Sequence, residues 1–225
     1  MMVGRLLFIL CSSWATAASA QGHTCGTLGS LTFSVPSGYI YFPMERVGDV
    51  WAKNQPRQDF ANCERRIQTV TLEFYYPSLS PATGFNQHND PNKTHIAVTV
   101  TLLSGVSRTH TFDATVARYA GEMERLGPVS ALVSNGFTGL QGIDPVYGRG
   151  LFKLYWKPAT GPSLELVQCR YYPDNPRATD ACKLSYFLDQ VPAVVTMRFA
   201  AALLDEREKL KTASLKMIER FSSKE

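Results

Sequence analysis

Apolar and polar residues alternate along most of the chain, and this alternation predicts β-strands. The alternating runs are rich in β-branched and aromatic side chains, which strands favour. In one run, Val70, Leu72 and Phe74 are separated by polar residues, as in an antiparallel strand with one face in water. The same pattern predicts strands at residues 31–42, 67–76, 95–103, 151–156, 164–171, 183–187 and 194–199.

Two segments have helical spacing instead, and we expect both helices to cover the buried side of the sheet. The first begins after Asp113, the predicted N-cap, and ends at Gly127 and Pro128. The second, at 200–221, carries charges of both signs opposite its apolar stripe, which favours packing on the sheet over lying on a membrane. This order of elements indicates an α+β fold, an antiparallel β-sheet with one internal helix and a C-terminal amphipathic helix packed on it.

The first twenty residues predict a cleavable signal peptide. Arg5 is followed by a largely apolar run, and Ala18 and Ala20 occupy the −3 and −1 positions of a cleavage site. A membrane anchor is the alternative, but polar residues interrupt the run before it reaches the roughly 20 apolar residues that a bilayer requires. We therefore expect an exported protein, periplasmic in a Gram-negative source, in which residues 21–225 form a single α+β domain.

The overall charge adds little to this picture. The chain has 23 Lys and Arg residues against 19 Asp and Glu, a formal net charge of +4. The basic residues are scattered, whereas nucleic-acid-binding proteins concentrate them on one face or helix. No segment after the leader is apolar enough to span a bilayer. We therefore expect neither a nucleic-acid partner nor stable membrane insertion.

Four cysteines remain after the leader, and an even set in an oxidising compartment favours disulfides. Four cysteines allow three pairings. Because Cys169 and Cys182 flank a turn-rich loop between two predicted strands, we pair them with each other and pair Cys25 with Cys63. Zinc is the alternative, but the chain has no Cys-x-x-Cys and its histidines lack the spacing of metal ligands. We expect no metal site.

A search for catalytic motifs finds none in the sequence. A common serine hydrolase requires Gly-x-Ser-x-Gly at a strained turn, and this pentapeptide does not occur. The remaining cysteines are assigned to disulfides, which excludes a thiolate nucleophile. Glu122 and Glu124 point to different faces of their helix, and no phosphate-binding glycine loop is present. We interpret the chain as a non-enzyme with no catalytic residue and no cofactor.

Three segments form a recognisable pattern: FSVPSGY at 33–39, LEFYYPSLSP at 72–81, and the C-terminal third with its two cysteines, the strand at 194–199 and the closing helix. Together they resemble periplasmic immunity proteins of Gram-negative type VI secretion systems, especially those that protect against lipase effectors. The resemblance implies a stoichiometric inhibitor that binds a toxin and blocks its active site or the access of its substrate. Such a protein requires no catalytic residues.

Long polar loops and exposed aromatic residues fit a protein-binding surface. Loops at 47–62 and 77–94 are either functional or tolerated insertions, and tyrosine pairs at 75–76 and 171–172 either anchor a partner or shield sheet edges. The predicted partner contacts, chosen because they lie in these loops, are Trp51, Phe85, His88 and Asn89. Two other functions stay open: an exported hydrolase with a site assembled from distant residues, and an envelope structural or assembly module.

Overall fold

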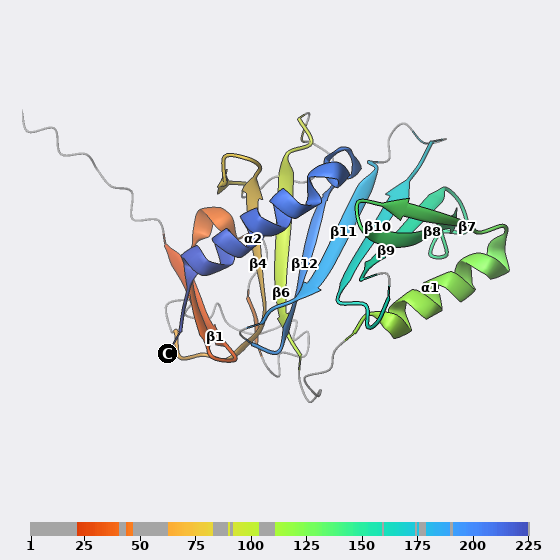
Figure 1. Ribbon diagram of the computed structural model, residues 1–225. Coiled ribbons are helices and arrows are strands. Elements are labelled where there is room, and N and C mark those ends of the chain that lie inside the picture. The colour runs from red at the N-terminus through yellow and green to blue at the C-terminus, as the bar shows by residue number, and fades with distance from the viewer. Residues whose placement is uncertain are drawn as a thin grey trace, which may run out of the picture.

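The computed structural model contains two antiparallel sheets and two α-helices in the part of the chain that it describes (Figure 1). The described residues are 22–40, 44–46, 63–82, 90, 92–103, 111–158, 160–173, 175, 179–189 and 191–224. The predicted signal peptide lies outside them, and so do Trp51, Phe85, His88 and Asn89.

The larger sheet is ten-stranded and antiparallel throughout. Its strands follow the order β3 (Glu45–Arg46), β4 (Ile67–Tyr75), β6 (His95–Leu102), β12 (Ala193–Ala200), β11 (Ala181–Phe187), β10 (Glu165–Tyr171), β9 (Leu151–Lys157), β8 (Phe137–Ile143) and β7 (Ser130–Ser134), with β5 (Ser80–Pro81) paired to β4. The α+β fold and all seven predicted strands are confirmed, with shifted ends.

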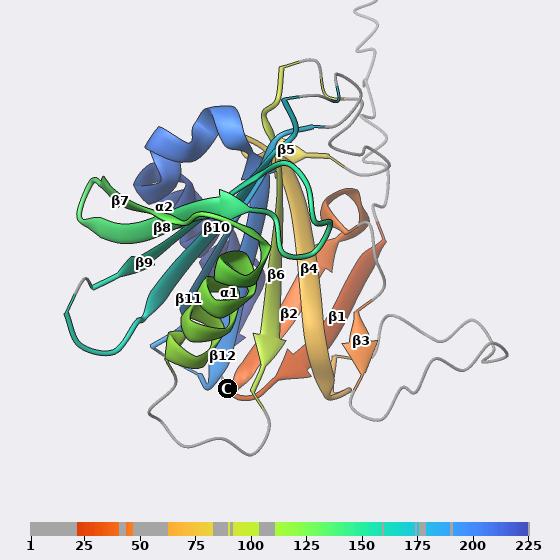
Figure 2. The ribbon, with the colours of Figure 1, turned by 90° about the vertical axis from the view of Figure 1, so that its right-hand side faces the viewer.

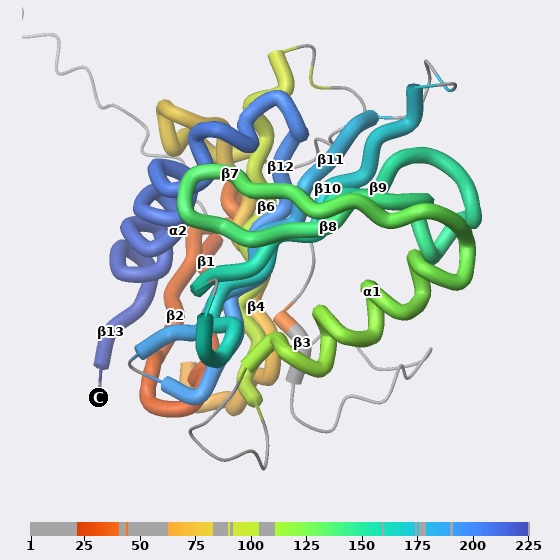
Figure 3. The backbone as a smooth tube through the Cα atoms, turned by 45° about the vertical axis from the view of Figure 1, so that its right-hand side comes forward, coloured from red at the N-terminus to blue at the C-terminus, as the bar shows by residue number. Residues whose placement is uncertain are grey.

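The smaller sheet brings the two ends of the described chain together. It contains β1 (His23–Leu28), β2 (Leu31–Pro36) and β13 (Ser222–Lys224), in that order. Figure 3 shows β13 beside β2. The predicted strand at 31–42 ends early because Pro36 has no N–H for further pairing, and the chain turns into the 3-10 helix η1 (Ser37–Tyr39).

The two helices pack on opposite faces of the large sheet, so the expectation that both cover one side is wrong. Helix α2 (Arg207–Phe221) crosses in front of β4, β6 and β12 in Figure 1 and buries Leu210, Met217 and Phe221. Helix α1 (Asp113–Leu126) buries Tyr119 and Met123 against the other face of β9 and β10. Figure 2 shows α1 at the β8–β11 end of the sheet.

The physical reason is that β9 and β10 each bury apolar side chains on both faces. Successive residues Leu166 and Val167 of β10 are both buried, Leu166 among the residues that contact α1 and Val167 in the core on the α2 side. A strand that buries both faces needs cover on both. We call the side that carries α1 the α1 face, and the side that carries α2 the α2 face.

Helix boundaries differ slightly from the prediction. The N-cap of α1 is Phe112, and Asp113 is the first helical residue, where its Oδ1 accepts a hydrogen bond of 2.9 Å from the Ser163 backbone N–H. The segment predicted as the start of the second helix is the separate 3-10 helix η3 (Ala201–Glu206). Buried Arg207 begins α2, donating hydrogen bonds to the carbonyls of Leu204 and Ser134.

Both disulfides pair as the sequence predicts. Cys25 is bonded to Cys63, and Cys169 to Cys182. Cys169 and Cys182 occupy opposite positions of β10 and β11. The first bridge joins the small sheet to the residues before β4, where the Thr27 N–H also donates to the carbonyl of Arg65. The two disulfides fit a protein that folds in an oxidising compartment.

Candidate functional site

The α1 face is polar beyond the part that α1 covers. Thr71, Thr99, Thr196 and Ser185 occupy opposite positions of β4, β6, β12 and β11 and form a row of hydroxyl groups across four strands. The Oγ1 atoms of Thr71 and Thr99 are 3.0 Å apart, and Ser185 Oγ lies 3.3 Å from Thr196 Oγ1. Because these hydroxyls pair with one another, the row is a fixed polar surface.

A second row, two residues further along the strands, is charged. Arg198 of β12 lies opposite Lys183 of β11, and Lys183 lies opposite Gln168 of β10. The neighbours of Lys183, Cys182 and Leu184, are buried in the core on the other side, so the alternation of the strand places Lys183 on the α1 face.

The charged row opens into a cavity of about 660 Å³. The β8–β9 loop contributes Tyr147 and Arg149 to its lining. The remaining principal lining residues come from β10, the loop after it, β11 and β12, and are Gln168, Arg170, Tyr172, Lys183 and Arg198. Four cationic side chains, distant in sequence, therefore border one hollow.

Buried Asp144 holds the β8–β9 loop in place. Its Oδ1 accepts a hydrogen bond of 2.9 Å from the Val146 N–H, and its Oδ2 lies 2.8 Å from Nε of Arg170. The Gly148 N–H donates to the Asp144 carbonyl at 2.8 Å. These contacts fix the short turn that carries Tyr147 and Arg149, so this wall of the cavity is formed before any partner binds.

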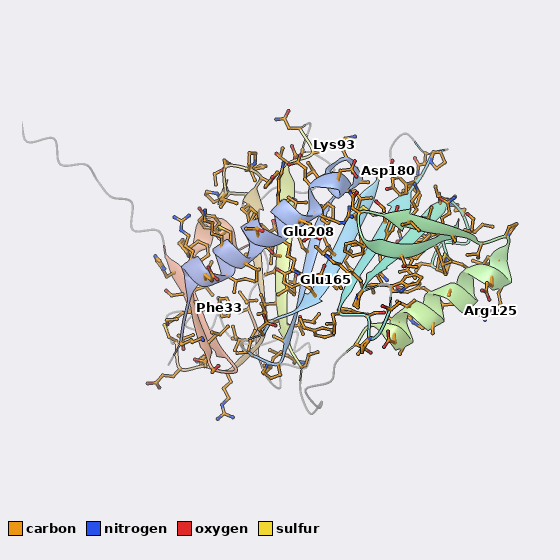
Figure 4. The ribbon with its side chains drawn as sticks, in the orientation of Figure 1. Phe33, Lys93, Arg125, Glu165, Asp180 and Glu208 are labelled. Carbon is orange, nitrogen blue, oxygen red and sulfur yellow. A yellow bond between two sulfur atoms is a disulfide. The ribbon has the colours of Figure 1, made fainter. Side chains whose placement is uncertain are left out.

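The start of the segment after β10 is held by Asp180, which lies at the end of the sheet beside η3 (Figure 4). Its Oδ1 accepts a hydrogen bond of 2.9 Å from the Tyr172 N–H, and its carbonyl accepts one of 3.0 Å from the Ala201 N–H. The ring of Tyr172 meets that of Tyr147 edge to face, with centroids 6.2 Å apart. The two tyrosines thus form an aromatic rim.

Positive charge in the cavity is only partly compensated. Arg170 forms an ion pair with Asp144, whereas within the described residues Arg149, Lys183 and Arg198 form no ion pair. Burial, reinforced by the positive charges of Arg198, Arg170 and Arg118, lowers the pKa of Lys183 from its ordinary value of 10.5. Lys183 is therefore a partly desolvated cation to which no described acidic side chain supplies a counter-charge.

The structure places the tyrosine pairs at 75–76 and 171–172 in different surroundings. All four side chains are half-buried. Tyr76 and Tyr171 pack against the core on the α2 side, and the Tyr76 hydroxyl donates a hydrogen bond of 3.0 Å to Glu206. Tyr172 lines the cavity. Within the described residues, the exposed aromatic ring is that of Tyr147, with 59% of its surface accessible.

A buried acid–base pair joins β4 to β6 on the α1 face. Nε2 of His95 lies 3.1 Å from Oε2 of Glu73, and each side chain is 5% exposed. The pair was not identified in the sequence because the two residues are 22 positions apart. Its burial separates it from solvent, and its contact stabilises the pairing of the two strands.

The cavity is lined by described residues, and none of the partner contacts predicted from the sequence is among those. Trp51, Phe85, His88 and Asn89 lie outside the described residues and remain predictions. The sequence did contain a signal for two of the cations, since Lys183 and Arg198 each stand between apolar residues in a predicted strand. Their juxtaposition depends on strand register, which the pattern does not give.

The described residues form neither a metal-binding cluster nor a membrane-spanning helix. No group of three or more His, Cys, Asp or Glu side chains there is arranged to hold a metal ion. Among the helices of that same part, none has both the length and the apolar character needed to cross a membrane.

Comparison with known proteins identifies a fold and no sequence family. No protein-family model and no curated protein matches the chain. A solved structure with 16% sequence identity and a TM-score of 0.54 covers 91% of this chain and 94% of its own: Smlt3025, an immunity protein of the Stenotrophomonas maltophilia type IV secretion system. The chain shares the fold of this immunity protein.

A second solved structure is similar at a lower level. It is FrpD, the iron-regulated outer membrane lipoprotein of Neisseria meningitidis, with 11% identity, a TM-score of 0.47, and coverage of 88% of this chain and 93% of that one.

The expected resemblance to immunity proteins is supported at the level of the fold by Smlt3025. The type VI system is not supported, because Smlt3025 comes from a type IV system.

Proposed function

We propose that the chain is an exported immunity protein that neutralises an antibacterial toxin by binding it stoichiometrically. The observation that carries the proposal is the cationic cavity with its tyrosine rim. Arginine and tyrosine are the side chains most enriched among the residues that dominate protein–protein binding energy. The fold shared with Smlt3025 over 91% of the chain supports the same function.

The construction of the cavity fits a binding surface that is formed in advance. Its floor consists of paired strands, and Asp144 and Asp180 hold segments that line it. A partner that docks on such a surface orders few side chains, so less of the interaction energy is lost to conformational entropy. An inhibitor that must act before the toxin reaches its substrate gains speed and affinity from this arrangement.

Binding without catalysis is favoured over the alternative of an exported hydrolase. A hydrolase brings a nucleophile or a general base into contact with its substrate. The Glu73–His95 pair is instead almost fully buried and connects two strands. The principal cavity residues are cations, tyrosines and a glutamine, which suit recognition of a partner.

We infer that the toxin is one that a neighbouring cell delivers through a contact-dependent secretion system. The predicted leader and the two disulfides support a site of action in the periplasm. A type IV system is the delivery class of the immunity protein that shares this fold.

Co-expression with the product of the adjacent gene tests the proposal. We expect a one-to-one complex on size-exclusion chromatography, and survival of cells that export this chain together with the toxin. Cells that export the toxin with an unrelated disulfide-containing periplasmic protein are the control, and they should die. Absence of both a complex and protection would contradict the immunity function, and turnover of ester or amide substrates by the isolated chain would favour the hydrolase.

A further inference from the structure

We propose that the cationic cavity recognises an acidic segment of the protein partner, with Asp or Glu carboxylates bound between Lys183 and Arg198. The proposal rests on the proposed function for the partner being a protein. Binding of a model acidic peptide tests the chemistry of the cavity independently of that function.

Two like charges stand side by side in the cavity and favour an anionic ligand. Lys183 and Arg198 are directly opposite one another on neighbouring strands of the same face. Side chains at such positions have Cβ atoms about 4.5–5.5 Å apart, and like charges there repel. In the described residues neither side chain has an acidic partner. A carboxylate placed between them converts this repulsion into two charge-assisted hydrogen bonds.

The surroundings of Lys183 also favour an anionic ligand. Burial and three neighbouring arginines lower its pKa, so its ammonium group is poorly solvated and faces positive potential. A buried charge without a counter-ion is unfavourable, and natural proteins pair such groups. The missing counter-charge is supplied when an anionic group of a ligand enters the cavity.

The size of the cavity favours a peptide segment over a single small anion. A volume of about 660 Å³ is within the range of cavities that enclose ligands of several tens of atoms. Tyr147 and Tyr172 at the rim offer apolar surface that a bare anion does not use. Arg149, on the β8–β9 loop, provides a third positive charge for a second carboxylate of the same segment.

Charge distribution favours an acidic peptide over a nucleic acid. A nucleic acid follows an extended track of basic residues and releases counter-ions along it. Here the net charge of the whole chain is +4, and three cations that form no ion pair with a described residue, Arg149, Lys183 and Arg198, gather in one hollow. A compact group of carboxylates matches this arrangement.

Fluorescence anisotropy with a labelled hexaglutamate peptide tests the recognition chemistry without the toxin. At about 50 mM salt we expect binding to the wild-type chain, and weakening when the salt is raised about tenfold. Binding to the double variant Lys183→Gln and Arg198→Gln should be weaker by about tenfold or more. Hexaglutamine, which lacks the charges, is the control peptide and should not bind.

Three further variants separate a specific site from general charge. Lys216→Gln removes a charge from an exposed position of α2, on the α2 face, and should leave the affinity within about twofold. Lys183→Arg keeps the charge and should retain most of the binding. Arg149→Gln should weaken binding less than the double variant does. Circular dichroism of every variant checks that the chain is folded.

Some results would overturn the proposal. These are no binding of hexaglutamate at low salt, equal affinity of the wild-type chain and the double variant, and equal loss with Lys216→Gln. Inorganic phosphate is the competing probe. If phosphate displaces the peptide at an equal concentration of anion, the cavity binds small anions and the acidic-segment proposal is wrong.

The toxin complex distinguishes this proposal from the immunity function. If the double variant loses hexaglutamate binding and protection together, both proposals are supported. If it loses hexaglutamate but still protects cells, the toxin docks elsewhere, so the inference fails and the immunity function stands. If hexaglutamate binding depends on Lys183 and Arg198 but no toxin is neutralised, the immunity function fails.

Discussion

At the scale of a single residue, Lys183 shows how a partly desolvated cation lowers the stability of the folded protein. It lies in a strand, opposite Arg198, at the edge of a cavity in which positive charge is in excess. Burial and the neighbouring arginines lower its pKa below 10.5, so folding disfavours its charged form. Residues placed for function commonly carry such a cost.

We predict that Lys183→Gln stabilises the free protein by about 0.5–2 kcal/mol at pH 7, because it removes a desolvated charge. A lowered folded-state pKa means that the unfolded chain binds more protons in the window below pH 10.5. Wild-type stability therefore rises relative to the variant as pH rises through this window, and the difference disappears above it. Urea unfolding at pH 7 and at about pH 10 measures both effects. A variant less stable than wild type at pH 7 would contradict the prediction.

At the scale of the elements, the hairpin of β7 and β8 forms without the alternating pattern typical of strands. Close packing of β8 against β9 accounts for it. Residues 130–143 contain several glycines, which by local pattern alone indicate turns and bulges. The hairpin does turn at Asn135 and Gly136, both at positive φ. Gly139, however, lies inside β8, where an added Cβ would stand 2.5 Å from the Leu154 carbonyl oxygen and 2.8 Å from the Tyr155 ring. Only glycine allows this contact between β8 and β9.

Two glycine-to-alanine substitutions test this interpretation as a matched pair. Gly139→Ala should destabilise the protein by about 1–3 kcal/mol, since the clash with a backbone oxygen in a paired strand is not relieved by a side-chain rotation. Gly121→Ala, in α1, meets no atom within 4 Å and should stabilise by up to about 1 kcal/mol. Thermal unfolding of both variants gives the measurement. Equal effects would show that the Gly139 contact does not determine the packing.

At the scale of the whole molecule, the two disulfides differ in what they join. Cys25–Cys63 links the small sheet to the start of β4 and spans 38 positions of sequence. Cys169–Cys182 lies within paired strands and spans 13 positions. A cross-link stabilises chiefly by limiting the unfolded chain, and more so for a longer loop.

We predict that replacing Cys25 and Cys63 together by alanine costs more stability than replacing Cys169 and Cys182 together. The chain-entropy relation gives about 4 kcal/mol for the first pair and about 3 kcal/mol for the second. Urea unfolding of the two double variants, with the oxidised wild-type chain as reference, measures the difference. The reverse order would indicate that strain or packing, and not loop length, determines the contribution of each bridge.

Much of the fold could be predicted from the sequence because it depends on local pattern. Alternation identified β4, β6, β9, β10, β11 and β12, and helical spacing identified α1 and α2. Strands β1, β7, β8 and β13 lacked that signal, since they are short, glycine-containing or polar. Their identity depends on neighbours that the sequence does not reveal.

The cationic cavity could not be predicted in the same way. The alternation around Lys183 and Arg198 places each on the polar face of its strand. Whether they stand opposite one another depends on the register between β11 and β12, and a shift by one residue would move one of them into the core. Arg149 reaches the cavity only because Asp144 and Arg170 fix the loop that carries it.

The sequence by itself determined the class of the fold, most of its elements and the pairing of its cysteines, because local periodicity and the positions of loops specify them. Only the tertiary structure decided that the helices lie on opposite faces and that cations from β10, β11, β12 and the β8–β9 loop share one cavity. The physical reason is that these features depend on contacts between distant segments. Strand register and the burial of both faces of β10 create those contacts.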